Sequence, residues 1–334
     1  MNDPKIELHV HLEGTIEPET LIAIARRNGY DLGVRSVEEL RELYRYRDFA
    51  HFIEIWVLTT NALRHEVDFR QAVVDYADRA AAQGAVYIEA IFSPIERAWR
   101  SVGWEEMFTG YCDGAQEARE RFGTDVRLTP DITREASLDD ALQLVHYASK
   151  YRERGVVGIG LGGMELGFPP EPFAPAFARA KERGLGSVPH AGEVCGPESI
   201  RGALEALEAD RIRHGIRAIE DPALVSELAG RGTVLDVCPV SNVRTGAVPS
   251  LDEHPLPRLA AAAVPCSVST DDPAMFDTDL AREYAAAARL GVSARACYEA
   301  GVAGALCDEA TRSRLLAIGH ESAWTDGIEG SVSP

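Results

Sequence analysis

The chain has 334 residues and a formal net charge of −19, from 34 Lys and Arg against 53 Asp and Glu. So acidic a chain would repel a phosphate backbone, which excludes nucleic-acid binding. No apolar run approaches the ~20 residues that cross a bilayer, which excludes a membrane-spanning protein. No signal peptide precedes the first strand-like segment, and the six cysteines form no C-x-x-C pair. We therefore expect a reduced, cytoplasmic protein.

Short apolar runs alternate with helix-like stretches along the chain. They predict eight strands, at 6–11, 86–92, 126–130, 156–161, 186–190, 211–214, 234–237 and 267–270. Helical patterns between them include 174–183, 198–209 and 223–229. This alternation predicts an α/β fold, a (β/α)8 TIM-type barrel, as a single domain over 1–322. A doubly wound open sheet is the alternative, but no G-x-G-x-x-G follows the first strand.

The first connection, residues 18–83, is far longer than a barrel loop needs. It predicts extra helices at 18–28, 37–44, 49–63 and 67–83 that cover the active site. Phe49, Phe52, Ile53 and Trp56 recur there at helical spacing, which favours core packing for most of them. One or two could form the wall of a ligand pocket, and Phe49 and Phe52 are the candidates. Residues 323–334 are expected to form a short C-terminal tail.

Metal-binding residue types gather at the ends of the predicted strands. His9 and His11 are two residues apart in the first strand, so both side chains share one face. The fifth strand ends in His190, the sixth in His214, and the eighth in Asp271. Active sites of (β/α)8 barrels lie at the C-terminal ends of the strands, so we expect these side chains to meet. The other five histidines lie in helix or loop contexts that suit structural roles.

Three imidazoles and one carboxylate form a ligand set that suits zinc. His9, His11, His190 and Asp271 would hold the ion, and water would complete an open shell in which its pKa falls to about 7.

Three further polar residues follow these ligands. Glu193, three residues past His190, can donate a proton to a substrate, and His214 can take one from the water. Asp272 follows a ligand directly, so its side chain is free to bind substrate.

Five segments carry a resemblance to a known family. The chain resembles the adenosine deaminase family of the amidohydrolase superfamily at 9–14 (HVHLEG), 190–193 (HAGE), 214–215 (HG), 238–242 (CPVSN) and 269–273 (STDDP). The resemblance implies the same four ligands and one zinc ion per chain. It also implies a hydrolase of purine metabolism that releases ammonia from C6 of an aminopurine and leaves an inosine-type product.

The resemblance implies roles for the remaining site residues. Glu193 would protonate purine N1 while hydroxide attacks C6, and His214 would act as base and electrostatic stabiliser. Asp272 would bind N7, and Gly163 would place its backbone N–H near N3. Asp271 would be both a ligand and part of the catalytic group.

The chain departs from the family pattern at four places. Glu13 stands where adenosine deaminases usually carry the Asp that contacts the ribose 5′-hydroxyl, and adenine deaminases usually carry Glu. Gly162 and Gly163 stand where adenine deaminases tend to have Ser, Ser269 replaces the usual Asn, and Arg213 replaces Gly or Asp.

These departures bear on the substrate. Glu13 can accept a hydrogen bond from a sugar hydroxyl, and the two glycines leave room for the purine N3 edge. We therefore favour adenosine, or a 5′-modified adenosine such as aminodeoxyfutalosine, over adenine or an N6-substituted purine. Two further readings are an amidohydrolase that cleaves an amide or ester, and a catalytically inactive purine-binding protein. The placement of Glu193 argues against the first, and the complete set of ligands and proton donor against the second.

Overall fold

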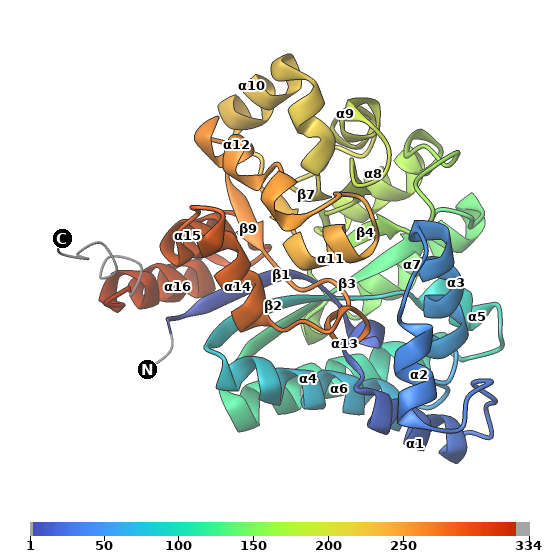
Figure 1. Cartoon of the computed structure of the whole chain (residues 1–334). Helices are drawn as coiled ribbons and strands as arrows, with labels where there is room; N and C mark the ends of the chain where they lie inside the picture. The colour runs from blue at the N-terminus through green and yellow to red at the C-terminus, as the bar shows by residue number, and fades with distance from the viewer. Residues whose placement is uncertain (1–2, 325–334) are drawn as a thin grey trace.

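The computed structural model describes residues 3–324. Its strands form two parallel arcs, β1 to β5 and β6 to β9 (Figure 1). Their bounds are β1 Lys5–His11, β2 Ala85–Phe92, β3 Asp125–Thr133, β4 Gly158–Gly162, β5 Gly186–Ser187, β6 His190–Ala191, β7 Ile212–His214, β8 Leu235–Val237 and β9 Cys266–Val268.

Backbone hydrogen bonds join the two arcs into a closed barrel. On one side, Asp271 N–H donates to His9 C=O at 3.1 Å, and His11 N–H donates to Asp271 C=O at 2.7 Å. On the other, Val188 N–H donates to Ile159 C=O, and Pro189 C=O accepts from Arg213 N–H. The predicted eight-stranded barrel is confirmed. Its fifth strand is interrupted between β5 and β6, where proline has no N–H to donate to a neighbouring strand.

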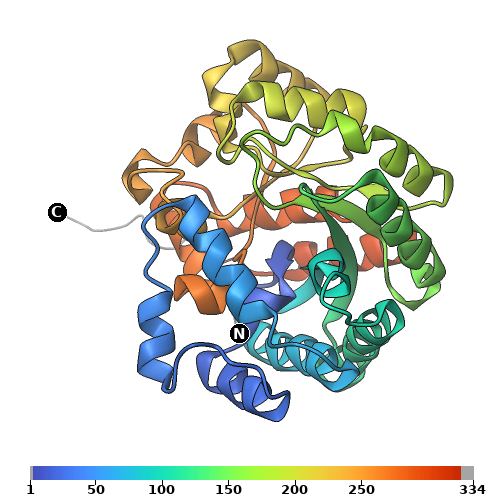
Figure 2. The same cartoon turned by 90° about the vertical axis from the view of Figure 1, so that its right-hand side faces the viewer.

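Helices surround the barrel (Figure 2). Their bounds are α1 Pro18–Arg27, α2 Val37–Leu43, α3 Phe49–Thr60, α4 Glu66–Ala82, α5 Pro94–Ala98, α6 Trp104–Phe122, α7 Leu138–Lys150, α8 Ala174–Glu182, α9 Pro197–Ala206, α10 Pro222–Arg231, α11 Pro239–Arg244, α12 Leu256–Ala261, α13 Pro273–Phe276, α14 Leu280–Arg289, α15 Ala294–Gly304 and α16 Glu309–Glu321. The long first connection forms α1 to α4, close to the predicted positions. No helix among residues 3–324 is long and apolar enough to cross a membrane.

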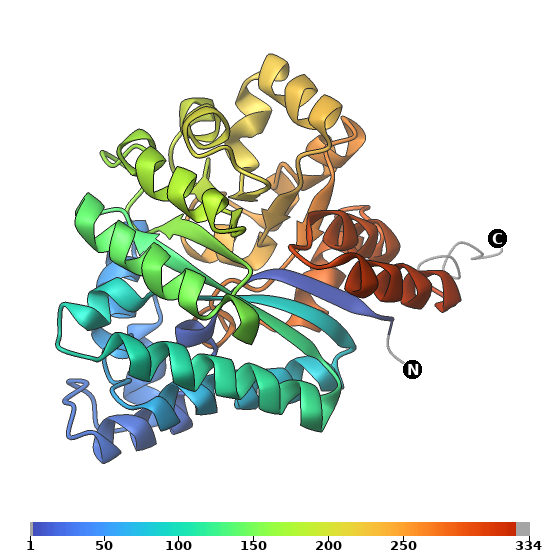
Figure 3. The same cartoon turned by 180° about the vertical axis from the view of Figure 1, so that it is seen from behind.

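The beginning of β1 lies beside α15 and α16 (Figure 3). An apolar cluster of side chains surrounds it. Ile6 and Leu8 pack there with Tyr87, Tyr298 and Leu315, all almost fully buried. The close approach of α15 requires Gly301, because a Cβ at that position would lie 2.8 Å from the Ile6 side chain. Because apolar packing occupies this end of β1, the polar site lies at the opposite, C-terminal end of the strand.

The domain boundary at 322 and the cytoplasmic location stay predictions, and most of the predicted tail lies outside the described residues.

Candidate active site

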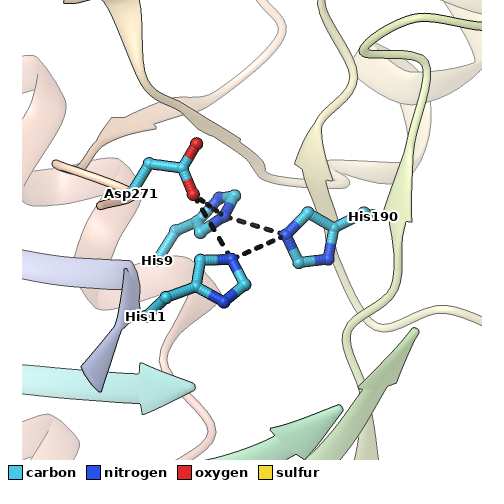
Figure 4. A group of neighbouring side chains, drawn as sticks. All are labelled: His9, His11, His190 and Asp271. Carbon is cyan, nitrogen blue, oxygen red and sulfur yellow. Dashed lines mark hydrogen bonds and ion pairs between the residues drawn. The ribbon is translucent and has the colours of Figure 1, made fainter. Parts of the chain in front are cut away.

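Four side chains from both arcs meet at the C-terminal ends of the strands (Figure 4). His9 Nε2 lies 3.0 Å from His190 Nε2 and 3.2 Å from Asp271 Oδ1. His11 Nε2 lies 3.2 Å from His190 Nε2 and 3.3 Å from Asp271 Oδ1. Ligands about 2.0–2.1 Å from a tetrahedral zinc ion are separated by about 3.3 Å. The spacing of these four atoms therefore fits a single ion.

The protonation of these imidazoles also fits a cation. Burial lowers the pKa of His11 to about 4 and holds the pKa of His9 well below its ordinary value. The rings are thus neutral at pH 7, and neutral imidazole is the form that binds metal. Lone pairs that face one another at 3.0–3.3 Å repel unless a proton or a cation lies between them.

Two of the candidate ligands, Asp271 and His190, are held by contacts on the side away from the cluster. Asp271 Oδ2 accepts from Ser241 Oγ at 2.6 Å, and His190 Nδ1 lies 3.0 Å from Leu161 C=O. His190 Nδ1 also lies 3.2 Å from Asp131 Oδ2. Such partners fix the ring orientation and direct Nε2 toward the ion.

The backbone is strained where two of the site residues are placed. His214 and Asp271 both adopt left-handed φ angles, 59° and 65°. This conformation costs a non-glycine residue roughly 1–2 kcal/mol, and such residues concentrate at functional sites. The turns bring both side chains to the mouth of the barrel.

Glu193 lies beside the cluster. Its Oε2 is 3.4 Å from His214 Nε2, while its Oε1 is buried without a hydrogen-bond partner in the described part of the chain. Burial, with the nearby Asp271 and Glu165 carboxylates, raises the pKa of Glu193 well above its ordinary value. The surroundings thus favour the protonated form of this carboxyl group, which also has a free oxygen, as a proton donor requires.

Burial lowers the pKa of His214 to about 3, so this ring is a neutral base. Its Nδ1 lies 3.2 Å from the side-chain amide of Asn242, and Nε2 is free to act as a base when Nδ1 carries the ring proton and donates it to the oxygen of that amide. Nε2 then faces Glu193 and Asp271 Oδ2, the latter at 3.9 Å.

Asp272 is held by a residue of the helical insertion. Trp56 Nε1–H donates to Asp272 Oδ1 at 2.8 Å. Burial and the adjacent Asp271 raise the pKa of Asp272 well above its ordinary value. The carboxylate needs Gly14 beneath it, because a Cβ at that position would lie 1.9 Å from Asp272 Oδ1. Asp272 is thus a buried acid whose surroundings favour the protonated form, and Trp56 occupies only one of its two oxygens.

One pocket joins all these groups to the surface. It encloses about 1050 Å³, including space open to solvent. Its walls carry the predicted Phe49 and Phe52 of α3, together with Gly163. At its outer end lie Trp99, which is 49% exposed, and Arg100. The pocket is therefore polar at the metal cluster and mainly apolar on the side of α3.

Glu13 is turned away from this pocket. Its Oε1 accepts from Ser93 N–H at 2.9 Å and lies 3.6 Å from Arg97 Nη1, and its side chain is fully buried. It is not among the lining residues. The sugar contact expected at this position therefore has no support in the geometry.

The space left by the two glycines is filled by carboxylates. A Cβ on Gly162 would lie 2.7 Å from Asp131 Oδ2, and one on Gly163 would lie 3.0 Å from Glu135 Oε2. Their role here is to admit these acids close to the backbone.

Arg213, unexplained by the sequence, lies in the barrel below the metal cluster. Its guanidinium donates to Asp131 Oδ1 at 2.5 Å and to Thr129 Oγ1 at 2.6 Å. It needs Gly160, where a Cβ would lie 2.3 Å from Arg213 Nη1. Asp131 is thus held between Arg213 and His190. Sequence reasoning missed Asp131, although it directly follows the predicted third strand, 126–130, which extends to Thr133 as β3.

Comparison with known proteins identifies the family of the chain. The family model for adenosine deaminase matches residues 4–318. An aminodeoxyfutalosine deaminase of Acidothermus cellulolyticus is 56% identical over 328 residues, 96% of this chain and 92% of that protein. The crystal structure of an adenine deaminase from Arthrobacter aurescens has a TM-score of 0.91 and 33% identity, covering 96% of this chain and 98% of that one.

A third relative contains a metal. An amidohydrolase from Burkholderia ambifaria with bound Zn has a TM-score of 0.86 and 25% identity, covering 95% of this chain and 90% of that one. The predicted fold and the predicted deaminase class of hydrolase are both confirmed. The chain belongs to the adenosine deaminase family.

Proposed function

We propose that the protein is a zinc-dependent deaminase that removes the 6-amino group of a 5′-modified adenosine, with aminodeoxyfutalosine as the favoured substrate. The observation that carries the reaction is the buried Glu193 carboxyl beside His214 and the cluster of three histidines and Asp271. The relative at 56% identity supports the choice of substrate.

His9, His11, His190 and Asp271 would hold the zinc ion. When bound, zinc supplies a Lewis acid that lowers the pKa of water to about 7. The relative with bound Zn and the fit of the four ligand atoms both support this metal.

The protein's own residues then supply the proton transfers. Glu193 donates its proton to purine N1, which makes C6 more electrophilic, and His214 accepts a proton from the attacking water. Asp272 donates to N7, because N7 is a hydrogen-bond acceptor and the raised pKa keeps this carboxyl protonated. Trp56 occupies the other oxygen of Asp272 and so fixes which oxygen faces the purine. Loss of ammonia from C6 completes the hydrolysis.

The pocket provides for a group larger than adenine. Beyond the metal cluster it continues along Ile53 and Val57 of α3 to Trp99 and Arg100 at the surface. An aromatic side chain and a guanidinium there suit a bulky substituent on the 5′ carbon of the sugar. A free base would leave this outer part empty.

A spectrophotometric assay of the metal-loaded protein tests the proposal. Aminodeoxyfutalosine, adenosine, adenine and an N6-substituted purine are compared by kcat/KM, and aminodeoxyfutalosine is expected to be the best substrate. Deamination of none of them would overturn the reaction. Preference for adenine over every nucleoside would instead place the chain with the adenine deaminases, which its structural likeness to the Arthrobacter enzyme makes the second candidate.

A substitution at Trp99, at the outer end of the pocket, further distinguishes the nucleoside substrate from adenine. Trp99→Ala should lower kcat/KM for aminodeoxyfutalosine by about 10-fold, as expected for loss of a partly buried aromatic contact. The values for adenine should not change. Leu316→Ala, at another exposed apolar residue on α16, is the matched control and should alter neither value.

A further inference from the structure

The buried carboxylate of Glu165 holds the segment that carries Glu193. Glu165 follows β4 and is 5% exposed. Its Oε1 accepts from Gly192 N–H at 2.6 Å and from Ser199 Oγ at 2.5 Å. Its Oε2 accepts from Val194 N–H at 2.7 Å and from Cys195 N–H at 2.8 Å. One side chain thus binds four donors of a single segment.

These bonds fix the backbone on both sides of Glu193. Gly192 precedes it in a left-handed conformation with φ 70°, and Val194 follows it. Because both neighbouring amides point at the same carboxylate, the direction in which the Glu193 side chain leaves the backbone is determined. No other side chain among residues 3–324 forms hydrogen bonds with both amides that flank Glu193.

Glu165 also lines the pocket, so a direct contact with substrate has to be considered. A carboxylate offers about four lone-pair positions. All four are used by the donors of the 192–199 segment, and none remains for a substrate hydroxyl or amino group. The geometry favours an action on Glu193 over an action on the substrate.

We propose that Glu165 is a positioning residue, which sets the place of the proton donor Glu193 relative to the purine ring. This inference rests on the proposed role of Glu193. Arg134 supports the same segment, because its Nη2 donates to His190 C=O at 2.7 Å. The loop after β4 and the loop after β6 thereby move as one unit.

Glu165→Gln tests the inference in the metal-loaded enzyme. The amide group directs N–H donors at backbone N–H groups, so the segment must shift. A displacement of about 1 Å can cost about 10²-fold in rate, so we expect kcat to fall by about 10- to 100-fold with little change in KM. Loss of a neighbouring negative charge should also move the alkaline limb of the kcat–pH profile to lower pH. Metal content should stay at the wild-type value.

Glu165→Asp distinguishes the effect of the negative charge from the effect of side-chain length. It also tests the inference if the glutamine variant does not fold. It keeps the charge but is one methylene shorter, so kcat should fall while the alkaline limb stays where the wild type has it. Glu198→Gln is the matched control, because Glu198 lies in the same segment and accepts only from Gly196 N–H at 3.1 Å. It should leave kcat and the pH profile unchanged.

The outcomes distinguish this inference from the proposed function. A wild-type enzyme without deaminase activity would contradict the proposed function. An active wild type that is impaired by Glu193→Gln, but in which Glu165→Gln has a normal kcat and pH profile, would overturn the positioning role alone. Equal losses in the Glu165 and Glu198 variants would show only general sensitivity of the segment and would overturn it as well.

Discussion

The two ends of the barrel interior use buried charge in opposite ways. Toward the N-terminal end, Arg211 forms ion pairs with Glu89 at 2.6 Å and Asp236 at 2.5 Å, and it donates to the carbonyls of Leu8 and Gly304. Ser267 Oγ donates to the second oxygen of Asp236. The charges at this end are saturated by one another, since Arg211 lies between two carboxylates, and this pairing is how a fold stabilises buried charge.

The C-terminal end is left unsaturated. Glu193 Oε1 and His11 Nδ1 have no hydrogen-bond partner among residues 3–324, and three imidazoles face one another and Asp271. The same barrel thus contains one polar layer whose charges are paired with one another and one in which candidate ligand atoms face each other without a counter-charge between them.

The largest effect is expected from a substitution that disrupts the paired charges around Arg211. Arg211→Met leaves the Glu89 and Asp236 carboxylates buried without their cation, so the free energy of unfolding should fall by about 3–5 kcal/mol. Urea unfolding measures this loss. The metal content and kcat of the folded fraction should remain, because Arg211 contacts no candidate ligand side chain. Loss of metal without loss of stability would remove the distinction between the two layers.

The next largest effect is expected from the loss of a candidate metal ligand at the C-terminal end of the barrel. His190→Ala removes one of four ligands, so most of the metal should be lost and kcat/KM should fall by more than the ~10²-fold typical of outer-shell changes. Elemental analysis and the deaminase assay measure the two effects. His320→Ala, at an exposed histidine of α16, should keep full metal content. A metal-free His190 variant with normal activity would contradict the proposed site.

Glu193→Gln tests whether Glu193 is the residue that donates the proton. The amide cannot donate the proton that N1 requires, while the ligands are untouched. We expect kcat to fall by about 10²-fold or more with the metal retained. Turnover near that of the wild type would assign the proton donor to another residue.

The smallest expected effect concerns Glu7, a buried carboxyl group below the metal cluster. Its hydrogen bonds only partly offset the free-energy cost of burying the ionised form. Burial raises its pKa from 4.5 to about 7, although Thr270 donates to it through N–H and Oγ1 and Tyr76 through its hydroxyl. The folded state therefore holds this proton longer than the unfolded state. The contribution of Glu7 to stability falls as pH rises from 4.5 through 7.

Glu7→Gln removes that titration. The unfolding free energy of the wild type minus that of the variant should fall by about 2 kcal/mol from pH 5.5 to pH 8, because most of this range lies below the folded-state pKa of about 7 and one pKa unit corresponds to about 1.4 kcal/mol. Urea unfolding of both proteins at the two pH values measures it. A difference that is the same at both values would show that Glu7 does not titrate in this range.

The sequence allowed the barrel, the helices of the first connection and the family to be predicted, because these depend on local patterns. Strand ends in a closed barrel converge, so His9, His190 and Asp271 could be placed together before their distances were known. The break at Pro189 was missed because an apolar run does not reveal which of its amides are paired.

The remaining site residues depend on contacts across the barrel. Asp131 and Glu165 are two among 53 acidic residues, and nothing in their spacing sets them apart. Arg213 fits only because Gly160, from another strand, has no side chain. Glu13 was assigned to the sugar from its position after β1, but Arg97 and Ser93 N–H hold it elsewhere.

The closure of the barrel by Val10 and Asp271 has a consequence for biosynthesis. The hydrogen bonds that join the last part of the barrel to the first are made by the backbones of His9, His11 and Asp271, the same residues that would bind the metal. A nascent chain must therefore extend past residue 271 before the fourth ligand exists. Until then it has three imidazoles and an open edge at β1, which is a site for mispairing. The complete set of four proposed ligands therefore forms only when the last part of the barrel has paired with the first, so a chain that fails to close the barrel also lacks the complete site.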